Sequence, residues 1–524
     1  MKVLVADSIS ESALDVLKAE PTFEVVYLPK KTGAKLADEI RDADALVVRS
    51  ATKVTAEMLA GAPRLRVVGR AGVGVDNVDL DAATRKGVVV MNTPGGNAVA
   101  VAEHTLALLL ALARQLPRAD SSLKQGVWEK KKLQGIELRG KTLGLVGLGK
   151  VGTEVARLAQ AFGMNVLAYD PYVPSRVAAE NGIELRALND LLGASDFVSL
   201  HSSLTPETRH LINARTLALA KPGVRLINCA RGELIDEAEL LAGLESGQVA
   251  GAGLDVFETE PPRDLKLLTH PSVIATPHIA GSTEEAQEVV GIRITEQVRD
   301  YLRLGVARNA VNMPSVSPEE YKKLEPYLRL GEKLGAFVAQ IAGERLEEVR
   351  ISYDGGLAEL NTALVRNAAL KGILSQIAED VNLINAAAQA QARGIEVVEL
   401  RSARRADYSH SLGIALRTET GICSALGMVG LRGGLRLLGI NDIDVEAPLQ
   451  GVILFIRNQD VPGVIGRVGT LLGNGRVNIA NFALGRNPSD EAIGLVNVDQ
   501  PVGGEVLNEI RAIPAVRVAK VIEV

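Results

Sequence analysis

Short apolar runs alternate with helical patterns over the first 97 residues of the chain. Each run is bounded by turn residues or followed by apolar positions at helical spacing, which is typical of parallel strands covered by helices. The predicted strands are Lys2–Ala6, Glu24–Leu28, Ala45–Arg49, Leu65–Gly69 and Gly87–Met91. This pattern predicts a doubly wound α/β layer.

A second alternating region follows, and it opens with the long helix Ala98–Arg114. This helix is too hydrophobic around its circumference for a lone surface helix, so it is expected in a domain core or a subunit interface. The predicted strands after it are Thr142–Val146, Asn165–Tyr169, Asp196–Leu200, Val224–Cys229, Ala250–Val256 and Val273–Thr276. A further helix is expected from Ser282, where Ser282 and Glu285 would form a capping box, to about Leu304.

The C-terminal part of the chain has a different pattern. Gly305–Pro318 contains two prolines and several polar residues, and we interpret it as a linker. Residues 319–449 mix helices with strand-like runs, and we identify no catalytic constellation among them. Residues 451–524 follow the order strand, helix, strand, strand, helix, strand, which predicts a small ferredoxin-like βαββαβ sandwich.

The strand Thr142–Val146 is followed at once by the glycine-rich turn GLGKVG at residues 147–152. In the G-x-G-x-x-G spacing the glycines allow a sharp turn, close approach of a pyrophosphate and tight helix–strand packing, and the helix N-terminus supplies free N–H groups. Asp170 ends the next strand, where a carboxylate binds ribose hydroxyls and repels a 2′-phosphate. The motif predicts NAD rather than NADP, held by Gly147, Leu148, Gly149, Lys150, Val151, Gly152 and Asp170.

A second glycine-rich turn, GRAGVG at Gly69–Gly74, also follows a strand. Its glycine spacing is wrong for a dinucleotide, and the next strand runs into Asn92 instead of an acidic residue. We interpret it as a loop whose N–H groups can hold a small anion. Arg70 in this loop and Arg49 both lie at strand ends, where two guanidinium groups can clamp a phosphate. Either arginine alone is more often a solvated surface residue.

Composition narrows the class of protein. A chain of 524 residues should hold about three or four domains, and its net charge of −5 comes without the basic stripe that nucleic-acid binding needs. Cys229 and Cys423 form no metal-ligand spacing, so we expect reduced cysteines and no metal. Thr105–Ala113 is too short to cross a bilayer, and Asp7 interrupts any signal-peptide core. We therefore expect a cytoplasmic, soluble protein with no membrane or nucleic-acid partner.

Three later stretches each place ionisable side chains after a predicted strand. NCARGELID contains Arg231, GLDVFETEPP contains Asp255 and Glu260, and TPHIAGST contains His278. Such strand ends converge on one crevice in an open α/β sheet. Hydride transfer from an alcohol needs a base for the hydroxyl proton. Histidine with a carboxylate partner suits that role, and an arginine can hold a carboxylate bidentately. Each residue alone is more often structural, and only their combination predicts a dehydrogenase site.

Together these motifs resemble those of the D-2-hydroxyacid dehydrogenase family. The resemblance covers residues 1 to about 310 and rests on VGRAGVGVDNVD, GLGKVG, LTPETRHLI, NCARGELIDE, LDVFETEPP and TPHIAGST, in that order. It implies a flavodoxin-like substrate domain, residues 1–97 and 287–310, into which a Rossmann-like NAD domain, residues 98–286, is inserted. The cleft would lie between two domains that can close.

The resemblance also implies roles for individual residues. His278 would be the general acid/base with Glu260 as its partner, and Arg231 would anchor the substrate carboxylate. Asp255 would contact the nicotinamide amide, and Thr205 would line the cofactor pocket. The remaining implied contacts are Ala230 and Gly281 for the cofactor, and Arg49, Arg70, Val73 and Gly74 for the substrate.

Three other histidines are candidates for the same catalytic role. Neither His201 nor His210 has a carboxylate motif comparable to that of His278. His104 lies within the apolar helix, so we expect it to be structural.

Within that family, the chain resembles the branch that oxidises D-3-phosphoglycerate with NAD to 3-phosphohydroxypyruvate, the entry step of L-serine synthesis. In that branch the segment matching Trp128–Lys132 reaches the site of a neighbouring subunit, which implies a homo-oligomer, either dimer or tetramer. From the residues alone, this charged run reads equally well as solvated surface.

The C-terminal half resembles the long bacterial form of the same branch. That form implies an α+β intervening domain, residues 319–449, and a regulatory ACT domain, residues 451–524. The ACT resemblance rests on NQDVPGVIGRVGTLLGNGRVNIANF at residues 458–482. It implies L-serine as an effector, held between paired domains by Asp460 and Asn478. From the residues alone, such a domain can simply dimerise.

Three alternatives remain open on the sequence. A hydroxypyruvate or glyoxylate reductase would share the fold, but it would need neither the paired arginines nor the C-terminal half. An NAD-sensing binding protein would share the cofactor turn, but the Arg–Glu–His set favours turnover. The ACT segment could also respond to an amino acid other than serine.

Overall fold

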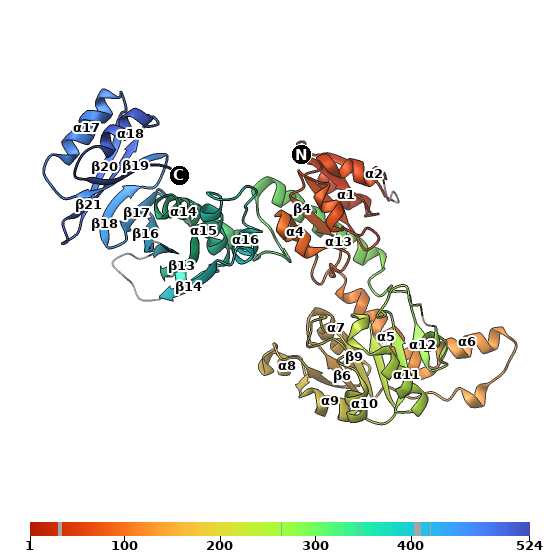
Figure 1. Cartoon of the computed structure of the whole chain (residues 1–524). Coiled ribbons are helices and arrows are strands. Elements are labelled where there is room, and N and C mark those ends of the chain that lie inside the picture. Colours follow the sequence, from red (N-terminus) through yellow and green to blue (C-terminus); the bar gives the residue numbers. More distant parts are fainter. Residues whose placement is uncertain (30–33, 264, 344, 403–409, 420) are drawn as a thin grey trace.

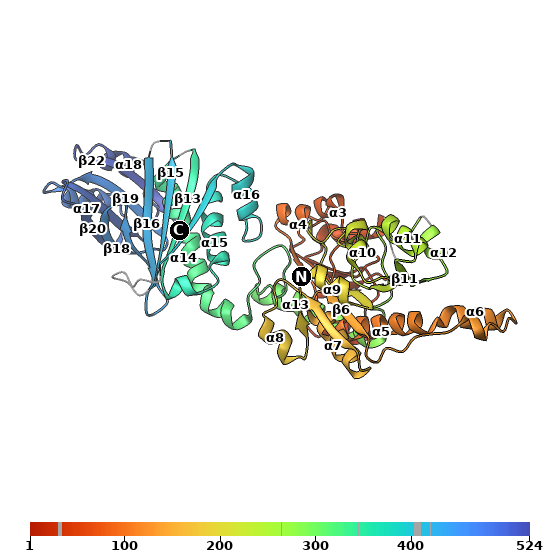
Figure 2. The ribbon, with the colours of Figure 1, turned by 90° about the horizontal axis from the view of Figure 1, so that it is seen from below.

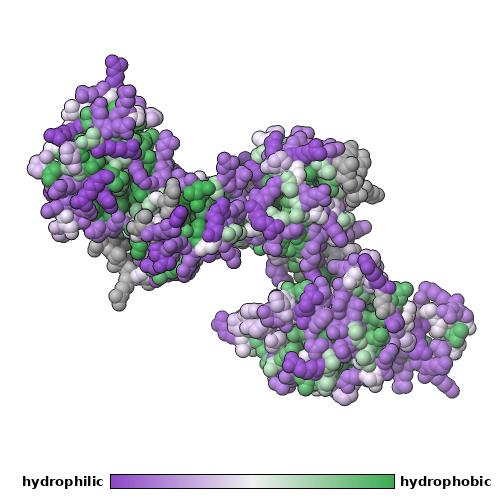
Figure 3. Space-filling view, in the orientation of Figure 1, coloured by the Kyte–Doolittle hydropathy of each residue, from purple (hydrophilic) through white to green (hydrophobic). Residues whose placement is uncertain are grey.

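The computed structural model describes residues 1–29, 34–263, 265–343, 345–402, 410–419 and 421–524. The chain is arranged as four bodies in a curved row (Figure 1), with the C-terminal β-rich body at one end and the body that carries α7 and β6 at the other. Charged and polar residues cover most of the face that Figure 3 shows.

The first body is built on a parallel sheet with the order β2-β1-β3-β4-β5. Its strands are β1 (Lys2–Val5), β2 (Glu24–Tyr27), β3 (Ala45–Val48), β4 (Val67–Arg70) and β5 (Val89–Met91). Helices α1 (Glu11–Lys18), α2 (Ala34–Glu39), α3 (Ala56–Ala60) and α4 (Leu80–Lys86) connect them. The predicted doubly wound layer is confirmed.

The long helix α13 (Glu284–Leu304) packs back onto this first sheet through Val290, Ile294 and Val298. The predicted capping box of Ser282 and Glu285 is wrong by one residue. Thr283 is the N-cap, because its side chain accepts from the Ala286 amide. Ser282 belongs to the preceding turn, where its own amide donates to the Ile279 carbonyl at 2.8 Å.

The second body holds a seven-stranded parallel sheet with the order β12-β11-β10-β9-β6-β7-β8. Chain order reverses between β6 and β9, so the carboxyl ends of these strands open a crevice there. The two-residue edge strand β8 lacked a sequence signal. The strands are β6 (Thr142–Val146), β7 (Asn165–Tyr169), β8 (Glu184–Leu185), β9 (Phe197–Leu200), β10 (Val224–Asn228), β11 (Val249–Leu254) and β12 (Val273–Ala275).

Helices cover both faces of this sheet. They are α5 (Ala98–Arg114), α7 (Lys150–Ala161), α8 (Ser175–Glu180), α9 (Leu188–Ala194), α10 (Ala214–Leu219), α11 (Glu237–Ser246) and α12 (Lys266–Thr269). The apolar helix α5 packs against α7, β10 and β11, with Leu106, Leu109 and Leu112 among its buried residues. Its hydrophobic circumference is therefore explained by a place in the core.

Helix α6 (Leu116–Lys124) continues from α5 across a 63° bend and projects from the second body (Figure 2). Leu116, Leu123, Val127 and Trp128 are exposed on or just after it, and Figure 3 shows apolar residues among hydrophilic ones on this segment. No single helix in the described ranges is long and apolar enough to cross a bilayer, and only the bent pair α5–α6 reaches that limit by length and composition.

The third body begins with α14 (Pro318–Ala342), capped by Ser317 and Glu320 in a capping box. Helices α15 (Ala363–Leu374) and α16 (Ala386–Ala392) cover a six-stranded sheet with the order β14-β13-β15-β16-β17-β18. Its strands are β13 (Leu346–Gly355), β14 (Glu396–Ser402), β15 (His410–Thr418), β16 (Gly421–Val429), β17 (Leu435–Ile440) and β18 (Ile443–Pro448).

The fourth body is the predicted βαββαβ sandwich, with the sheet order β20-β21-β19-β22. It consists of β19 (Val452–Gln459), α17 (Val464–Asn474), β20 (Ile479–Arg486), β21 (Glu491–Val498), α18 (Gly504–Arg511) and β22 (Val516–Glu523). One face of the sheet packs on its own helices. Ile453, Phe455 and Ile522 instead join the core of the third body.

The C-terminal half is joined to the first body by more than a linker. Ala310 forms a bridge with Met91, and the Val311 amide donates to the Val90 carbonyl at 2.8 Å. From the third body, Asn382 Nδ2 donates to the Gly87 carbonyl at 3.0 Å. The segment predicted as a linker is therefore partly attached to the edge of the first sheet.

Candidate active site

The GLGKVG turn has the backbone that a bound pyrophosphate requires. Gly147 has φ +98°, and a Cβ there would lie 2.7 Å from the His201 carbonyl oxygen. A Cβ on Gly152 would lie 2.2 Å from the Gly147 oxygen, whereas nothing stands within 4 Å of the position for Gly149. Helix α7 begins at Lys150. The turn is tight where helix meets strand and open where a phosphate would approach, so these residues fit NAD.

Asp170 lies directly beside this turn. Its Oδ2 accepts from the Leu148 amide at 2.8 Å, and its Oδ1 accepts from the Tyr172 amide at 2.9 Å. These bonds fix the carboxylate at the end of β7, the place from which such a residue binds ribose hydroxyls. Lys150 Nζ donates instead to the Pro94 carbonyl at 3.1 Å, in the segment that leads to α5.

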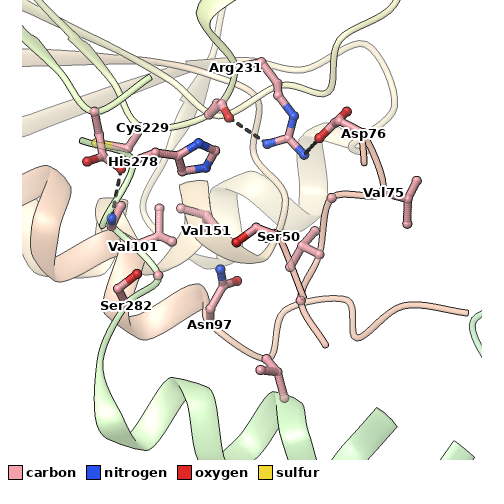
Figure 4. A pocket seen from close by; sticks show the side chains of 18 of the residues that line it. Ser50, Val75, Asp76, Asn97, Val101, Val151, Cys229, Arg231, His278 and Ser282 are labelled. Carbon is pink, nitrogen blue, oxygen red and sulfur yellow. Dashed lines mark hydrogen bonds and ion pairs between the residues drawn. The ribbon is translucent and has the colours of Figure 1, made fainter. Parts of the chain in front are cut away.

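A cavity of about 680 Å³ lies between the first and second bodies. Figure 4 shows Ser50 and Asp76 of the first body facing Val151, Arg231 and His278 of the second. The sequence-predicted residues that line it are Arg49, Arg70, Val73, Gly74, Val151, Ala230, Arg231, Asp255, Glu260, His278 and Gly281. Thr205 does not line the cavity, although the preceding residues 201–204 do. Apart from Val151, the GLGKVG residues and Asp170 also lie outside this cavity.

His278 and Glu260 form a close pair in the cavity, with 2.7 Å between Nδ1 and Oε2. The hydrogen bond that His278 donates to Glu260 raises the pKa of His278, whereas burial and the charge of Arg231 oppose that rise. His278 has φ +53°, a left-handed conformation that is uncommon outside glycine. Its Nε2 is left for a substrate, because Nδ1 is bonded to the carboxylate.

Three arginines surround the other side of the cavity. Burial lowers the pKa of Arg70, and repulsion from Arg231 and Arg49 lowers it further. The Nε atom of Arg70 is buried without a partner among the described residues. Arg49 is held by Ser8 and Gln287, whose oxygens accept from its Nη1 at 3.1 and 3.4 Å. Like charges that repel one another at a cavity wall favour an anionic ligand.

Arg231 crosses from the second body to the first. Its Nη2 lies 3.0 Å from Asp76 Oδ2, and its Nη1 donates to the Ala230 carbonyl at 2.7 Å (Figure 4). Asp76 lies in the motif VGRAGVGVDNVD, but no pattern in that motif predicted a role for it. The contact exists because the loop after β4 and the end of β10 face each other across the cavity.

Asp255 is fully buried at the end of β11. Its Oδ1 accepts from Thr276 Oγ1 at 2.6 Å and from the Ile279 amide at 2.9 Å, and its Oδ2 accepts from the Ala280 amide at 2.8 Å. Burial acts to raise the pKa of Asp255, but the hydrogen bonds outweigh it and the pKa is lowered. Oδ2 keeps one acceptor position, which the nicotinamide amide could use. The predicted contact between Asp255 and that amide stays a prediction.

The competing histidines occupy different environments. Burial lowers the pKa of His201 to about 4, and its Nε2 lies 2.9 Å from Ser199 Oγ. Such a group is a poor base near neutral pH. The sequence shows no carboxylate motif for His210 comparable to that of His278, yet Glu258 Oε1 lies 3.2 Å from its Nε2. His210 nevertheless lies outside the cavity lining.

The two predicted effector residues lie at opposite ends of the ACT sheet. Asp460 follows Gln459, which pairs with Glu491 at one end of β21, whereas Asn478 precedes Ile479, which pairs with Val498 at the other end. Asn478 Nδ2 donates to Asp499 Oδ2 at 2.6 Å, and Asp460 lies 3.5 Å from Arg486. The two residues of one chain therefore do not form a single site.

Three family models match the chain. Residues 106–280 match the NAD-binding domain of D-isomer-specific 2-hydroxyacid dehydrogenases, residues 323–441 match the D-3-phosphoglycerate dehydrogenase intervening domain, and residues 452–515 match the ACT domain.

Similar proteins cover the chain from end to end. A D-3-phosphoglycerate dehydrogenase of Synechocystis is 44% identical over 98% of this chain and 93% of its own length. One of Methanocaldococcus jannaschii is 43% identical over 100% of this chain and 99% of its own. Among solved structures, a D-lactate dehydrogenase of Aquifex aeolicus, complexed with NAD and lactic acid, is 32% identical with a TM-score of 0.52, covering 60% of this chain and 100% of that one.

Proposed function

The chain belongs to the D-3-phosphoglycerate dehydrogenases of the D-isomer-specific 2-hydroxyacid dehydrogenase family, and we propose which of its residues bind and oxidise D-3-phosphoglycerate. It is an NAD-dependent oxidoreductase that converts D-3-phosphoglycerate to 3-phosphohydroxypyruvate, the first step of L-serine biosynthesis. The observation that carries the proposed residue roles is the meeting of three arginines with the His278–Glu260 pair in one cavity.

His278 takes the hydroxyl proton of the substrate at Nε2. Glu260 holds Nδ1–H, which fixes the ring orientation and stabilises the imidazolium that forms. NAD, when bound on the Gly147–Gly152 turn with its ribose at Asp170, supplies the acceptor for the hydride from carbon 2. The raised pKa of His278 strengthens its neutral ring as a base and allows its imidazolium to act as the acid in the reverse reaction.

Arg231 binds the substrate carboxylate, assisted by the loop with Val73 and Gly74. A guanidinium presents two parallel donors to a carboxylate and orients the carbon that loses the hydride. In the present arrangement Nη2 is paired with the exposed Asp76. A substrate carboxylate would compete with Asp76 for the same donors.

Arg49 and Arg70 bind the phosphate at the far end of the substrate. The buried, unpartnered Nε of Arg70 and the repulsion among the arginines support this assignment. A phosphate with close to two negative charges relieves that repulsion and satisfies several donors at once.

Comparing D-3-phosphoglycerate with D-glycerate, which lacks the phosphate, tests the clamp. The double variant Arg49→Ala, Arg70→Ala should raise KM for D-3-phosphoglycerate by at least about 100-fold, since each lost charge-assisted bond is worth about 1.5–3 kcal/mol. Turnover of D-glycerate should hardly change. The exposed Arg41 provides a matched control as Arg41→Ala. An unchanged KM in the double variant would remove the phosphate-clamp assignment.

We also propose that the active form is a homo-oligomer built through the projecting segment after α5. Its exposed Leu116, Leu123, Val127 and Trp128, followed by Lys130–Lys132, fit an apolar contact with a basic rim. Leu123→Asp with Val127→Asp should lower the mass measured by light scattering, whereas Ile377→Asp, another exposed apolar position, should not. An unchanged mass would place the interface elsewhere.

The two unpaired cysteines fit a cytoplasmic location.

The ACT domain is proposed to bind L-serine between two chains. Asp460 and Asn478 lie at opposite ends of one sheet, so they can serve one ligand only when two ACT domains pair in antiparallel orientation. Serine should inhibit the wild type, and Asn478→Ala should weaken that inhibition without changing uninhibited turnover. If another amino acid inhibits and serine does not, the effector assignment is wrong.

A further inference from the structure

His104 of α5 lies outside the cavity lining but contacts the network beneath the catalytic loop. Its Nε2 is 3.0 Å from Thr276 Oγ1 and 3.5 Å from Asp255 Oδ1. Its side chain is only 19% exposed. The sequence indicated a structural residue in an apolar helix, and no step of the mechanism above uses it.

The direction of these hydrogen bonds follows from the groups involved. Asp255 has a lowered pKa, so its carboxylate is ionised and can only accept. The single hydroxyl proton of Thr276 is therefore donated to Asp255, over 2.6 Å. Thr276 Oγ1 can then only accept from His104, which must carry its proton on Nε2. The chain of donors runs from His104 through Thr276 to Asp255.

Asp255 in turn holds the backbone of the catalytic base and of the two residues after it. Its own carbonyl accepts from the His278 amide at 2.8 Å, and its carboxylate accepts from the Ile279 and Ala280 amides. His278 needs such support because its backbone has φ +53°, a conformation that costs about 1–3 kcal/mol and persists only when its surroundings enforce it. A carboxylate free to rotate would not enforce it.

We propose that His104 is a positioning residue for the general base His278. Through Thr276 it locks the Asp255 carboxylate in the rotamer that clamps residues 278–280, and this keeps His278 within 2.7 Å of Glu260. The inference deepens the function proposed above and depends on His278 being the base. Because His104 lies on the buried helix α5, it connects the loop of residues 276–280, which carries His278, to the core of the NAD-binding body.

The test compares His104→Leu, which removes the donor, with His104→Gln, whose amide can still donate to Thr276. In His104→Leu, kcat should fall about tenfold, the effect of one lost hydrogen bond and a displaced base. KM for D-3-phosphoglycerate should stay unchanged, because the arginines are untouched. His104→Gln should recover kcat to within about threefold. Thr276→Val breaks the same chain at its middle and should behave like His104→Leu.

The pH profile separates positioning from simple loss of folded enzyme. The groups facing His278 are Glu260, Asp255 and Arg231. A loosened loop weakens the Glu260 bond that raises the pKa of His278, so the acid limb of kcat should move to lower pH in His104→Leu. Loss of folded protein would lower the whole profile without moving it. Glu103→Gln, an exposed neighbour on the same turn, is the control.

A turnover-independent measurement keeps this proposal distinct from the proposed function. The ring signals of ¹³C-labelled histidines give the pKa of His278 directly. The His278 signal is the one that disappears in His278→Ala. That pKa should be lower in His104→Leu and Thr276→Val than in wild type, and restored in His104→Gln. A fall in kcat with an unmoved pKa and no rescue by glutamine would overturn the proposal. A wild type that does not oxidise D-3-phosphoglycerate would overturn the proposed function alone.

Discussion

Two glycine-rich turns, GRAGVG and GLGKVG, each follow a parallel strand, yet they use glycine for different purposes. In GLGKVG the glycines shape the backbone, and a helix begins at Lys150 with its N–H groups toward the turn. In GRAGVG the glycines make room for arginines. A Cβ on Gly72 would lie 1.6 Å from Arg70 Nη1, and one on Gly74 would lie 2.2 Å from Arg231 Nη2. No helix follows until Leu80.

What a glycine-rich turn binds therefore depends on which groups contact the ligand, backbone N–H groups or side chains. The first kind of site binds an anion with N–H groups and a helix dipole. The second kind binds an anion with flexible guanidinium groups, which fit because the glycines beside them have no side chains. Substitutions in the two turns should therefore produce opposite patterns of loss.

The largest effect is expected when the side-chain ligand itself is changed. Arg231→Gln should lower kcat/KM for D-3-phosphoglycerate about 1,000-fold, since losing one partner of a buried charged pair costs about 2–5 kcal/mol. Arg231→Lys should recover only part of this, because an ammonium lacks the parallel donors. NAD affinity, measured by fluorescence titration, should stay near wild type. A parallel loss of NAD affinity would mean that the two turns are not independent.

A smaller loss is expected for the acid–base pair that lies between the two turns. Glu260→Gln should lower kcat about 100-fold, within the range for general acid–base catalysis. The glutamate raises the pKa of His278, and the base must be neutral to accept the proton. The acid limb of the kcat profile therefore lies above the ordinary histidine value in wild type and should move to lower pH in the variant. An unmoved limb would show that Glu260 does not set that pKa.

A backbone change in the cofactor turn comes next. Gly152→Ala places a Cβ 2.2 Å from the Gly147 oxygen, where only backbone can move. Such overpacking costs about 1–3 kcal/mol, so the Kd for NAD should rise roughly 5- to 150-fold. The change should leave substrate affinity nearly intact. A Cβ on Gly149 would have no neighbour within 4 Å among the residues that the structure describes, so any loss of NAD affinity in Gly149→Ala would report the bound cofactor alone.

The smallest effect is expected in the other turn. Gly74→Ala meets the far end of Arg231, a flexible side chain that can shift. KM for D-3-phosphoglycerate should rise about tenfold, at the lower end of the overpacking range, with the Kd for NAD unchanged. If Gly74→Ala weakened NAD binding and Gly152→Ala weakened substrate binding, the separate roles given to the two turns would be wrong.

Local patterns carried most of the fold. The parallel strands, the G-x-G-x-x-G turn and the βαββαβ order depend on periodicity and turn residues that lie close together in sequence. The residues that faced each other were harder to predict. Asp76 beside Arg231, His104 beneath Asp255 and Asn382 against Gly87 each join segments far apart in the chain. Such contacts arise from tertiary packing, and no local sequence pattern predicts them.

The edges of elements show a similar limit. Ser282 and Thr283 are both good N-caps, and the turn that uses the Ser282 amide decides between them. The two-residue strand β8 exists because it pairs with β7, not because of its own composition. The sequence did not indicate the projecting α6, and only the structure shows that its apolar side chains Leu116 and Leu123 are left uncovered in one chain.

The most direct test is NADH formation from D-3-phosphoglycerate and NAD, with a trap for the oxo product, in wild type beside His278→Ala. The wild type should turn over steadily. The variant should lose about 100- to 10,000-fold of that turnover, with NAD and D-3-phosphoglycerate still bound. A variant that kept wild-type turnover would contradict the assignment of His278 as the base and, with it, the roles given to Glu260 and His104.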